Sequence, residues 1–315
     1  MRILVTSEYS KKGLDKLKEW FGEIEYIPWT EKGKALSKAE LMEILSKFSP
    51  DGIITELDNI SAEVIDKNEN LKFIGDCRGT PSNIDLNAAK NRNIPVFYTP
   101  GRNAQAVSEL LVGMLIAFYR NLIDAAKWTK GGNWIDPPPK SYYMYQGNEL
   151  YGKTVGFVGF GAIGQITAKM LRGFGCEILY YDPFVTIDDK NIKSVTIDEI
   201  FKHSDIVTVH LPVLDTTKGM VSKELISKMK SSAIIVNTAR MAVMDSEALY
   251  EALKNKNIRG AIIDVFNHEP PDANDFRIIE LENVLATPHI CGATFEVVDH
   301  QSDIINNQIK DYFKL

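Results

Sequence analysis

Three side chains in the second half of the chain could act together on a small acid. Arg240 lies in "IIVNTARMAVMD", Glu269 in "IIDVFNHEPP" and His289 in "NVLATPHICGAT", each just past an apolar run. A guanidinium can bind a carboxylate through two parallel hydrogen bonds, and a histidine can transfer a proton near neutral pH. A nearby glutamate can orient the ring and favour its protonated form. Taken singly, each residue has an ordinary alternative as an ion-pairing arginine, a solvated loop acid or a helix-capping histidine.

The stretch "TVGFVGFGAIGQ", residues 154–165, has the glycine spacing of a dinucleotide-binding turn. Gly159 permits the tight turn, Gly161 lets a pyrophosphate approach the backbone, and Gly164 lets the helix pack closely on the strand. Asp182 ends the next apolar run, where a carboxylate can accept hydrogen bonds from the adenosine ribose. Because Asp182 would repel the extra phosphate of NADP, we predict NAD as the cofactor. The alternative is a glycine-rich turn that binds no ligand.

These residues must be positioned by two series of strands and helices. The first series contains "RILVT", "KGLDKLKEWF", "EIEYI", "KAELMEILSKF", "DGIIT", "SAEVIDK", "LKFIG" and "IPVFY". The second contains "KTVGFVG", "EILYY", "DIVTVHL", "AIIVN", "RGAIID" and "NVLAT". This alternation is typical of βαβ units and predicts an α/β fold with two doubly wound parallel sheets. Ligands bind at the carboxyl ends of such strands, so the side chains that follow them can converge on one cleft.

Between the two series, the pattern changes twice. Residues 103–127 contain no proline and one interior glycine, which predicts a single long helix that bridges two domains. Its apolar face is predicted to serve as core and subunit interface. The following stretch, "TKGGNWIDPPPKSYYMYQG", is rich in glycine and proline and predicts an irregular arm.

Several of these motifs, in this order, resemble the D-isomer-specific 2-hydroxyacid dehydrogenases. The resemblance covers nearly the whole chain: "TPGRNAQAVSELLVGMLIA", "LYGKTVGFVGFGAIGQ", "SDIVTVHLP", "MKSSAIIVNTAR", "GAIIDVFNHEPP" and "NVLATPHICGAT". It implies a flavodoxin-like substrate domain formed by residues 1–100 and 290–315. Residues 101–289 are then an inserted Rossmann NAD-binding domain, which explains why the glycine turn lies so late in the chain.

The resemblance also implies roles for individual residues. Arg240 binds the substrate carboxylate and carbonyl, His289 is the acid/base and Glu269 is its partner, while Asp264 contacts the cofactor near the nicotinamide. The implied cofactor-binding residues are Gly159, Gly161, Ala162, Ile163, Gly164, Asp182, His210, Pro212, Thr238, Ala239, Asp264 and Gly292. The implied substrate-binding residues are Arg78, Gly79, Thr80, Asn103 and Arg240.

Two departures from the family pattern concern the substrate. Met241 and Ala242 follow Arg240 where the family commonly has glycines, and they could reshape the nearby pocket. In "CRGTPSNID", Arg78 stands where the family has a small residue. We expect Arg78 either to face a second anionic group of the substrate or to point outward and pair with Asp76 or another surface acid.

Composition excludes several other classes of protein. Among 315 residues, 36 Lys and Arg are scattered against 42 Asp and Glu, so nucleic acid and anionic membranes are not expected as partners. The three cysteines, Cys77, Cys176 and Cys291, are far apart and lack metal-ligand spacing, so no metal site is predicted and a reducing cytoplasm fits best. The longest apolar stretch, residues 110–119, is well short of the ~20 residues that span a bilayer.

We therefore predict a cytoplasmic enzyme that transfers a hydride between NAD and C2 of a small D-2-hydroxy acid or 2-keto acid, with phosphorylated and sugar-derived acids among the candidates. The alternative is an NAD-sensing protein that keeps the fold without significant turnover. A formate or phosphite dehydrogenase is disfavoured by Glu269, since formate oxidation removes no alcohol proton. A homodimer is implied by the family resemblance.

Overall fold

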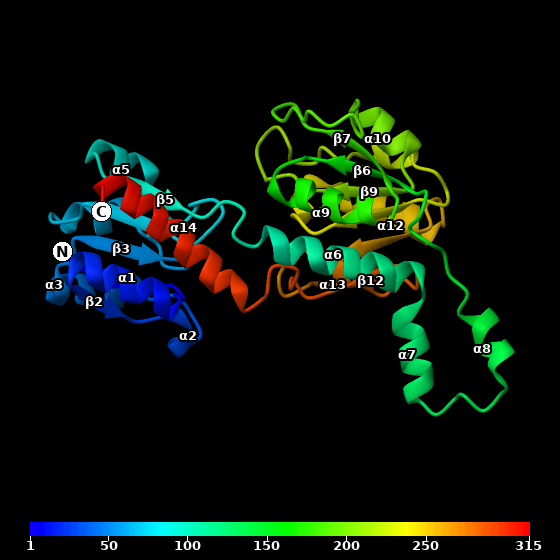
Figure 1. The fold of residues 1–315 in the computed structure, drawn as a ribbon, viewed down its shortest axis with the longest axis horizontal. Helices are drawn as coiled ribbons and strands as arrows, with labels where there is room; N and C mark the ends of the chain where they lie inside the picture. The colour runs from blue at the N-terminus through cyan, green and yellow to red at the C-terminus, as the bar shows by residue number, and fades with distance from the viewer. The chain divides into compact units, whose positions relative to one another are not determined.

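The computed structural model describes residues 1–315 and divides them into two compact units. Unit 1 comprises Met1–Asn103 and Ala293–Leu315, and unit 2 comprises Ala104–Gly292. Each unit is built around a sheet whose strands all run parallel (Figure 1). The predicted fold class, α/β with two parallel sheets, is therefore confirmed.

Unit 1 has a five-stranded sheet in the order β2-β1-β3-β4-β5, which is the order of flavodoxin-like folds. Its strands are β1 (Arg2–Val5), β2 (Glu23–Tyr26), β3 (Gly52–Thr55), β4 (Phe73–Asp76) and β5 (Val96–Tyr98). Its helices are α1 (Lys11–Phe21), α2 (Trp29–Lys32), α3 (Lys38–Phe48), α4 (Ala62–Lys67), α5 (Leu86–Asn91) and α14 (Glu296–Phe313). Strands β3 and β4 are buried along their whole length, as expected of a parallel sheet covered on both faces.

The last helix, α14, completes unit 1 by packing beside α1. Tyr9 donates its hydroxyl hydrogen to Asn306 Oδ1 at 2.8 Å, and Asn306 Nδ2 donates to the carbonyl of Gly13 at 3.1 Å. A Cβ on Gly13 would lie 2.8 Å from the Tyr9 ring and 2.9 Å from Ser302 Cβ. Glycine at this position therefore lets the two helices, almost 300 residues apart in sequence, come into contact.

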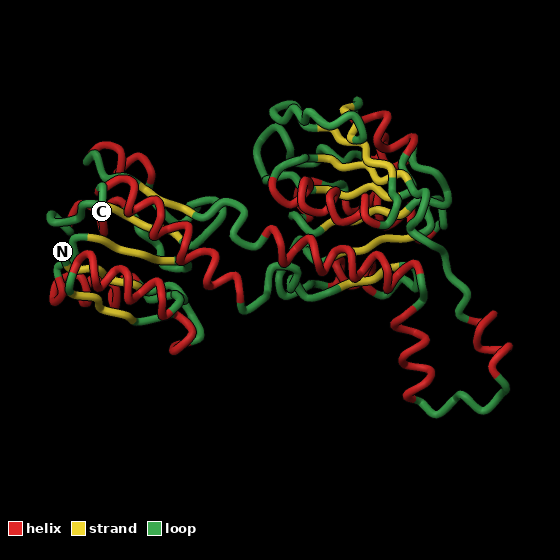
Figure 2. Tube along the Cα trace, viewed as in Figure 1, coloured by secondary structure: helices red, strands yellow, loops and turns green.

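Unit 2 has a seven-stranded sheet in the order β12-β11-β10-β9-β6-β7-β8. Figure 2 shows strands of the two units in yellow and helices in red. The strands of unit 2 are β6 (Thr154–Val158), β7 (Glu177–Tyr181), β8 (Ile192–Ser194), β9 (Ile206–Val209), β10 (Ile234–Asn237), β11 (Gly260–Ile263) and β12 (Val284–Ala286). Its helices are α6 (Ala104–Tyr119), α7 (Leu122–Lys130), α8 (Pro138–Met144), α9 (Ala162–Gly173), α10 (Ile197–His203), α11 (Lys223–Ser227), α12 (Ser246–Lys254) and α13 (Ala273–Ile279). The strand order reverses between β6 and β9, and such a switch point creates a crevice at the carboxyl ends of the strands.

The prediction of one helix over residues 103–127 is wrong, because the chain bends by 68° between α6 and α7. Asn121 adopts a left-handed conformation, with φ 51° and ψ 32°, at the start of α7. Asparagine is one of the few residues other than glycine that adopts this conformation readily. No single helix of the chain is both long and apolar enough to cross a membrane; only this bent pair meets the criterion of length and composition.

The predicted irregular arm also contains a helix, α8, which begins within its three prolines. Pro137 is the N-cap residue, and Pro138 and Pro139 occupy the first helical positions. The first turn of a helix leaves its backbone N–H groups unpaired, so proline is tolerated there and its fixed φ suits the helix. The proline run thus starts a helix instead of preventing one.

Candidate active site

The predicted catalytic residues follow three adjacent strands of the unit 2 sheet. Arg240 follows β10, Asp264 and Glu269 follow β11, and His289 follows β12, which are neighbours in the order β12-β11-β10. Because parallel neighbours end at the same edge, the loops that carry these side chains emerge together at the carboxyl edge of the sheet.

Glu269 and His289 form the central contact of this edge. His289 Nδ1 lies 2.7 Å from Glu269 Oε2, and both side chains are about 40% exposed to solvent. Glu269 Oε1 accepts the backbone N–H of Phe266 at 3.2 Å, so the carboxylate is held on its other side. His289 itself has a left-handed φ of 54°, a conformation that non-glycine residues rarely adopt and that concentrates at functional sites. With Nδ1 directed at Glu269, the Nε2 atom is left to exchange a proton with a ligand.

Asp264 organises the loop on which His289 lies. Its side chain is fully buried, and Oδ1 accepts the hydroxyl of Thr287 at 2.6 Å and the N–H of Ile290 at 2.9 Å. Its Oδ2 accepts the N–H of Cys291 at 2.8 Å. A carboxylate has about four acceptor positions, so one remains for a further partner. The sequence predicted a cofactor contact for Asp264 but did not indicate that its carboxylate also fixes the loop of His289.

Arg240 is exposed and pairs with no acidic side chain. Its Nη1 atom donates to the carbonyl of the preceding Ala239 at 2.6 Å. The turn that presents it is held by Asn237, whose Nδ2 donates to the carbonyl of Arg240 at 3.1 Å and whose Oδ1 accepts the N–H of Ala239 at 3.0 Å. The guanidinium is thus available to an anionic ligand. Met241, predicted to reshape a pocket, is instead 2% exposed and packs in the hydrophobic core of unit 2, because the 3₁₀ turn Met241–Val243 directs it inward.

The glycine turn between β6 and α9 has the geometry that a dinucleotide requires. Gly159 has a φ of +89°, and a Cβ there would lie 2.7 Å from the carbonyl oxygen of His210. A Cβ on Gly164 would lie 3.1 Å from the carbonyl oxygen of Gly159. Around Gly161, by contrast, nothing lies within 4 Å of the position of a Cβ, so the backbone is open to a ligand at the N-terminus of α9.

Asp182 connects this turn to the end of β7. Its Oδ2 accepts the N–H of Phe160 at 2.7 Å, and its Oδ1 accepts the N–H of Phe184 at 2.9 Å. Two of its acceptor positions remain for the hydroxyls of a ribose. The carboxylate therefore holds the turn in place and still has acceptor positions free.

Two buried polar atoms at the same edge have no partner within the chain. These are Nδ1 of His210, after β9, and Oγ1 of Thr238, after β10. Burial lowers the pKa of His210 to about 4, so its ring is neutral at pH 7. It stacks on Phe157 with ring centroids 5.8 Å apart and contacts Thr208 Oγ1 at 3.0 Å through Nε2. Unpaired buried polar atoms are costly, and a bound polar ligand would remove that cost.

The remaining predicted cofactor residues lie at the same edge with varied exposure. Ala162 and Pro212 are exposed, whereas Ile163, Ala239 and Gly292 are half-buried. Together with the glycine turn, Asp182 and the two unpaired polar atoms, they fit a dinucleotide with its pyrophosphate at the N-terminus of α9.

Unit 1 carries the predicted substrate residues at the carboxyl edge of its own sheet. Gly79 and Thr80 are exposed and Asn103 is half-buried. Arg78 is half-buried and forms no ion pair, so the alternative in which it pairs with Asp76 is not observed. Burial raises the pKa of Asp76 to about 7, a rise that the positive charge of Arg78 opposes. No hydrogen-bond donor reaches either Asp76 oxygen, although the Asn83 amide lies nearby.

An ion pair at this edge was missed by the sequence analysis. Arg102 Nη2 lies 2.8 Å from Glu56 Oε1, and the two side chains are largely buried. Trp29 Nε1 donates to Glu56 Oε2 at 2.9 Å, and Arg102 Nη1 also donates to Gln301. Arg102 directly precedes Asn103, a predicted substrate residue. This position in the sequence could have indicated that Arg102 lies at the same edge. The pair ties the loops after β3 and β5 to α14 within unit 1.

The glycine turn, the acid–base pair and the free guanidinium at one sheet edge define a nicotinamide-dependent oxidoreductase. The chain belongs to the D-isomer specific 2-hydroxyacid dehydrogenases, whose NAD binding domain model matches residues 112–291. The family, the enzyme class and the cofactor NAD, all predicted from the sequence, are thereby confirmed.

Relatives of known sequence and structure agree with this assignment. The chain is 46% identical over 312 residues to YoaD of Bacillus subtilis (strain 168), a protein assigned to the 2-hydroxyacid dehydrogenases, covering 99% of this chain and 91% of that protein. It is 38% identical over 262 residues to a hydroxypyruvate reductase of Thermotoga maritima, covering 83% of each. The solved structure of the TT0316 protein from Thermus thermophilus matches with a TM-score of 0.84 at 32% identity, covering 100% of this chain and 97% of that one.

Proposed function

We propose that the protein interconverts a small 2-keto acid and its D-2-hydroxy acid, with the Glu269–His289 pair as its acid–base centre. The observation that carries the proposal is the 2.7 Å contact between His289 Nδ1 and Glu269 Oε2 at the edge that also holds the glycine turn. Hydroxypyruvate is the first substrate to test, because the Thermotoga relative is a hydroxypyruvate reductase. Glyoxylate, pyruvate and phosphorylated 2-keto acids are the comparison set.

In the direction of reduction, each residue has a separate task. Arg240 holds the substrate carboxylate and carbonyl oxygen through its free guanidinium N–H groups. His289 donates a proton from Nε2 to the C2 oxygen, while Glu269 stabilises the imidazolium through Nδ1. NADH, when bound, supplies the hydride. Asp264 keeps the His289 loop in place and takes one further hydrogen bond from the cofactor.

The proposed cofactor and substrate residues extend beyond this centre. The cofactor residues are Gly159, Gly161, Ala162, Ile163, Gly164, Asp182, His210, Pro212, Thr238, Ala239, Asp264 and Gly292. Unit 1 contributes Arg78, Gly79, Thr80 and Asn103 to substrate binding, and the exposed backbone at Gly79 and Thr80 offers N–H groups to a carboxylate.

The test is the loss of NADH absorbance with each 2-keto acid, for the wild type and for His289→Ala. The variant should lose ~10²- to 10⁴-fold in kcat, which is the usual contribution of general acid–base catalysis, and should bind NADH as the wild type does. His203→Ala, at the exposed end of α10, is the matched control and should retain full activity. Tight NADH binding without turnover of any acid would instead favour the NAD-sensing alternative.

We also propose that the enzyme works as a cytoplasmic homodimer. All three cysteines are free and buried, as suits a reducing compartment. The segment from α7 through α8 exposes large apolar side chains that a second copy could cover: Leu122, Ile123, Trp134, Ile135, Tyr142, Tyr143 and Met144. Sedimentation should give a mass of two chains, and polar substitutions at Ile135 and Tyr142 should convert it to one.

A further inference from the structure

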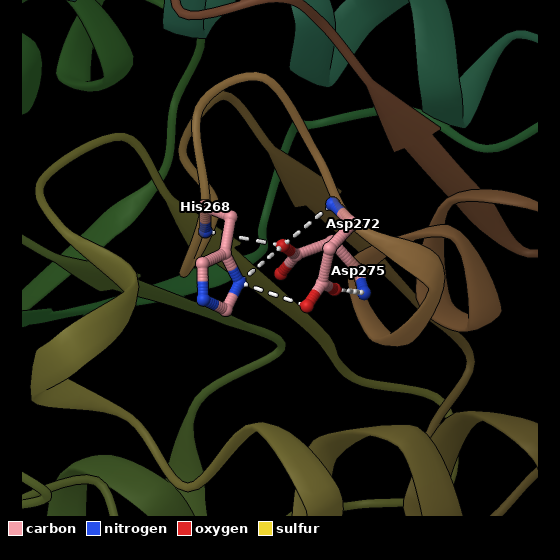
Figure 3. Close-up of side chains that lie close together, drawn as sticks. All are labelled: His268, Asp272 and Asp275. Carbon is pink, nitrogen blue, oxygen red and sulfur yellow. Dashed lines mark hydrogen bonds and ion pairs between the residues drawn. The ribbon is translucent and has the colours of Figure 1, made fainter.

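Three titratable side chains cluster where the loop after β11 meets the start of α13: His268 in the loop, Asp272 at the N-cap and Asp275 in the first turn of the helix (Figure 3). By residue type they could ligate a cation. However, Asp272 Oδ1 accepts the N–H groups of Asn274 at 2.8 Å and Asp275 at 3.0 Å, and so caps α13. His268 Nδ1 lies 3.1 Å from Asp272 Oδ2 and 3.3 Å from Asp275 Oδ2. The carboxylates are engaged by the chain itself, and we assign no cation to them.

Asp275 is the buried member of the cluster and binds the backbone of the loop. Asp275 is only 2% exposed to solvent. Its Oδ1 accepts the N–H of Asn267 at 3.1 Å, and its Oδ2 accepts the N–H of His268 at 3.1 Å and that of Asp272 at 3.3 Å. Burial alone would raise its pKa, but these N–H groups outweigh burial and hold the pKa below its ordinary value. The group is therefore an anion at neutral pH.

The segment that Asp275 holds contains Glu269. Three successive N–H groups of the loop point at carboxylates: that of Phe266 at Glu269, and those of Asn267 and His268 at Asp275. The loop is thus fixed on both sides of Glu269, at residues 267–268 before it and at Asp272 after it. No side chain of the loop other than Glu269 contacts His289 by a hydrogen bond.

We propose that Asp275 is a positioning residue that places the Glu269 carboxylate against His289. The proposal rests on the acid–base role of that pair proposed above. Without the Asp275 anion, the N–H groups of Asn267, His268 and Asp272 lose their charged acceptor, and the loop is no longer held in one position. Glu269 would then leave the position in which it stabilises the imidazolium.

The test measures the titration of the His289 ring by NMR in the whole protein. The chain has only five histidines, so His289→Ala assigns its resonance. Glu269→Gln should lower the midpoint of the titration, because the imidazolium loses its carboxylate partner. Asp275→Asn should lower it in the same direction by at least half as much, and should reduce kcat about tenfold with NADH affinity unchanged. If Asp275→Asn does not fold, Asp275→Ser gives the same comparison.

Two control variants separate positioning from stability and from metal binding. Asp272→Asn weakens the cap of α13 but leaves the acceptor of Asn267 and His268, so it should lower the free energy of unfolding without moving the midpoint. His268→Ala removes only the exposed ring and should leave midpoint and activity unchanged. A midpoint in Asp275→Asn equal to that of the wild type overturns the proposal. A second pair of results would also overturn it: chelation abolishes wild-type activity, which added Zn²⁺ restores, and His268→Ala is inactive. The cluster would then act by binding a metal.

The Glu269→Gln background distinguishes failure of this inference from failure of the proposed function. In that background, Asp275→Asn should cause no further drop in kcat or in the His289 midpoint, because the two changes act through one contact. Additive losses of kcat would mean that Asp275 acts elsewhere, and would overturn its positioning role. If Glu269→Gln and His289→Ala both kept full activity, the proposed function itself would fail.

Discussion

Three aspartates at the carboxyl ends of strands differ in how many hydrogen bonds their oxygens accept. Asp264 accepts three and Asp182 accepts two, whereas Asp76 accepts none. The first two accept N–H groups of the backbone that they organise, and each keeps spare acceptor positions for a ligand. Asp76 is buried without a hydrogen-bond donor, and the nearby positive charge of Arg78 offsets only part of the cost of burial, so its ionisation is unfavourable.

The charge of Asp182 should determine the preference for NAD over NADP. Asp182→Asn keeps an acceptor for the N–H of Phe160 or Phe184 but removes the charge that would face the extra phosphate. Two charges ~4 Å apart interact by about 1 kcal/mol in water and by more near a protein surface, so kcat/KM with NADPH should rise roughly tenfold relative to NADH. The measurement is kcat/KM with both cofactors. Equal use of NADP and NAD by the wild type would contradict the assignment of this role to Asp182.

Asp76 should make the protein less stable as the pH rises. Its pKa is about 7 in the folded chain and near the ordinary value of 3.8 when unfolded, so the folded state binds the proton more tightly. The contribution of Asp76 to the free energy of unfolding is then fully present below pH ~4. It is lost as the pH rises to ~7, by on the order of 4 kcal/mol in total. Asp76→Asn should remove this fall, because its amide does not titrate and can donate to the unpaired Asn83 Oδ1.

Urea unfolding at pH 5 and pH 8 checks this prediction. Asp58→Asn is the matched control, since Asp58 is also buried but accepts the N–H of Leu36 at 2.7 Å and the hydroxyl of Thr55 at 3.0 Å. That variant should be less stable than the wild type at both pH values. If Asp76→Asn were stabilised relative to the wild type no more at pH 8 than at pH 5, ionisation of the Asp76 carboxyl would not destabilise the fold as inferred.

At the scale of elements, the turn between β6 and α9 combines two glycine requirements that mutagenesis can separate. Gly159 is needed by the fold, because of its φ of +89° and the carbonyl of His210, 2.7 Å from a Cβ. Nothing lies within 4 Å of a Cβ position at Gly161, so we expect only a bound ligand to require glycine there. Gly159→Ala should therefore lower both stability and NADH binding. Gly161→Ala should change stability by less than ~0.5 kcal/mol, the usual range for open sites, and still weaken NADH binding at least tenfold.

Urea unfolding and NADH fluorescence titration measure the two effects independently. Wild-type NADH affinity in Gly161→Ala would show that the pyrophosphate does not approach this backbone. A large loss of stability in the same variant would show that the turn is tighter than its open surroundings indicate.

Elements with a strong apolar period were predictable from the sequence, whereas those set by single residues were not. Strands β9, β10 and β11 are apolar and fully buried, and each was expected. The bend between α6 and α7 depends on the left-handed Asn121, and α8 depends on prolines placed at its first turn. Neither feature alters the periodicity on which the prediction rested, so periodicity alone could not reveal them.

At the scale of the whole molecule, strand ends made it predictable that the proposed catalytic side chains follow neighbouring strands, but the contacts that fix the surrounding loops were not predictable. Arg240, Glu269 and His289 each follow an apolar run, and parallel strands bring their loops to one edge. Asp275 accepts backbone N–H groups of the nearby loop in unit 2, and Glu56 and Arg102 join segments of unit 1 that lie far apart in sequence. The order of residues in a sequence does not show which backbone N–H groups of a folded loop will donate to which carboxylate.

Substrate choice should depend on Arg78 of unit 1. Arg78 is half-buried and forms no ion pair, so its guanidinium is free to bind an anionic group of the substrate other than the carboxylate that all 2-keto acids share. Hydrogen bonds to a charged group contribute roughly 1.5 to 3 kcal/mol, which corresponds to about ten- to a hundredfold in specificity. Arg78→Ala should lose this factor in kcat/KM on a phosphorylated or dicarboxylic 2-keto acid and leave glyoxylate nearly unaffected. Arg78→Lys, which keeps the charge without the planar fork, should lose only part of it. Equal losses on both classes of substrate would instead make Arg78 a structural residue whose charge serves mainly the buried Asp76.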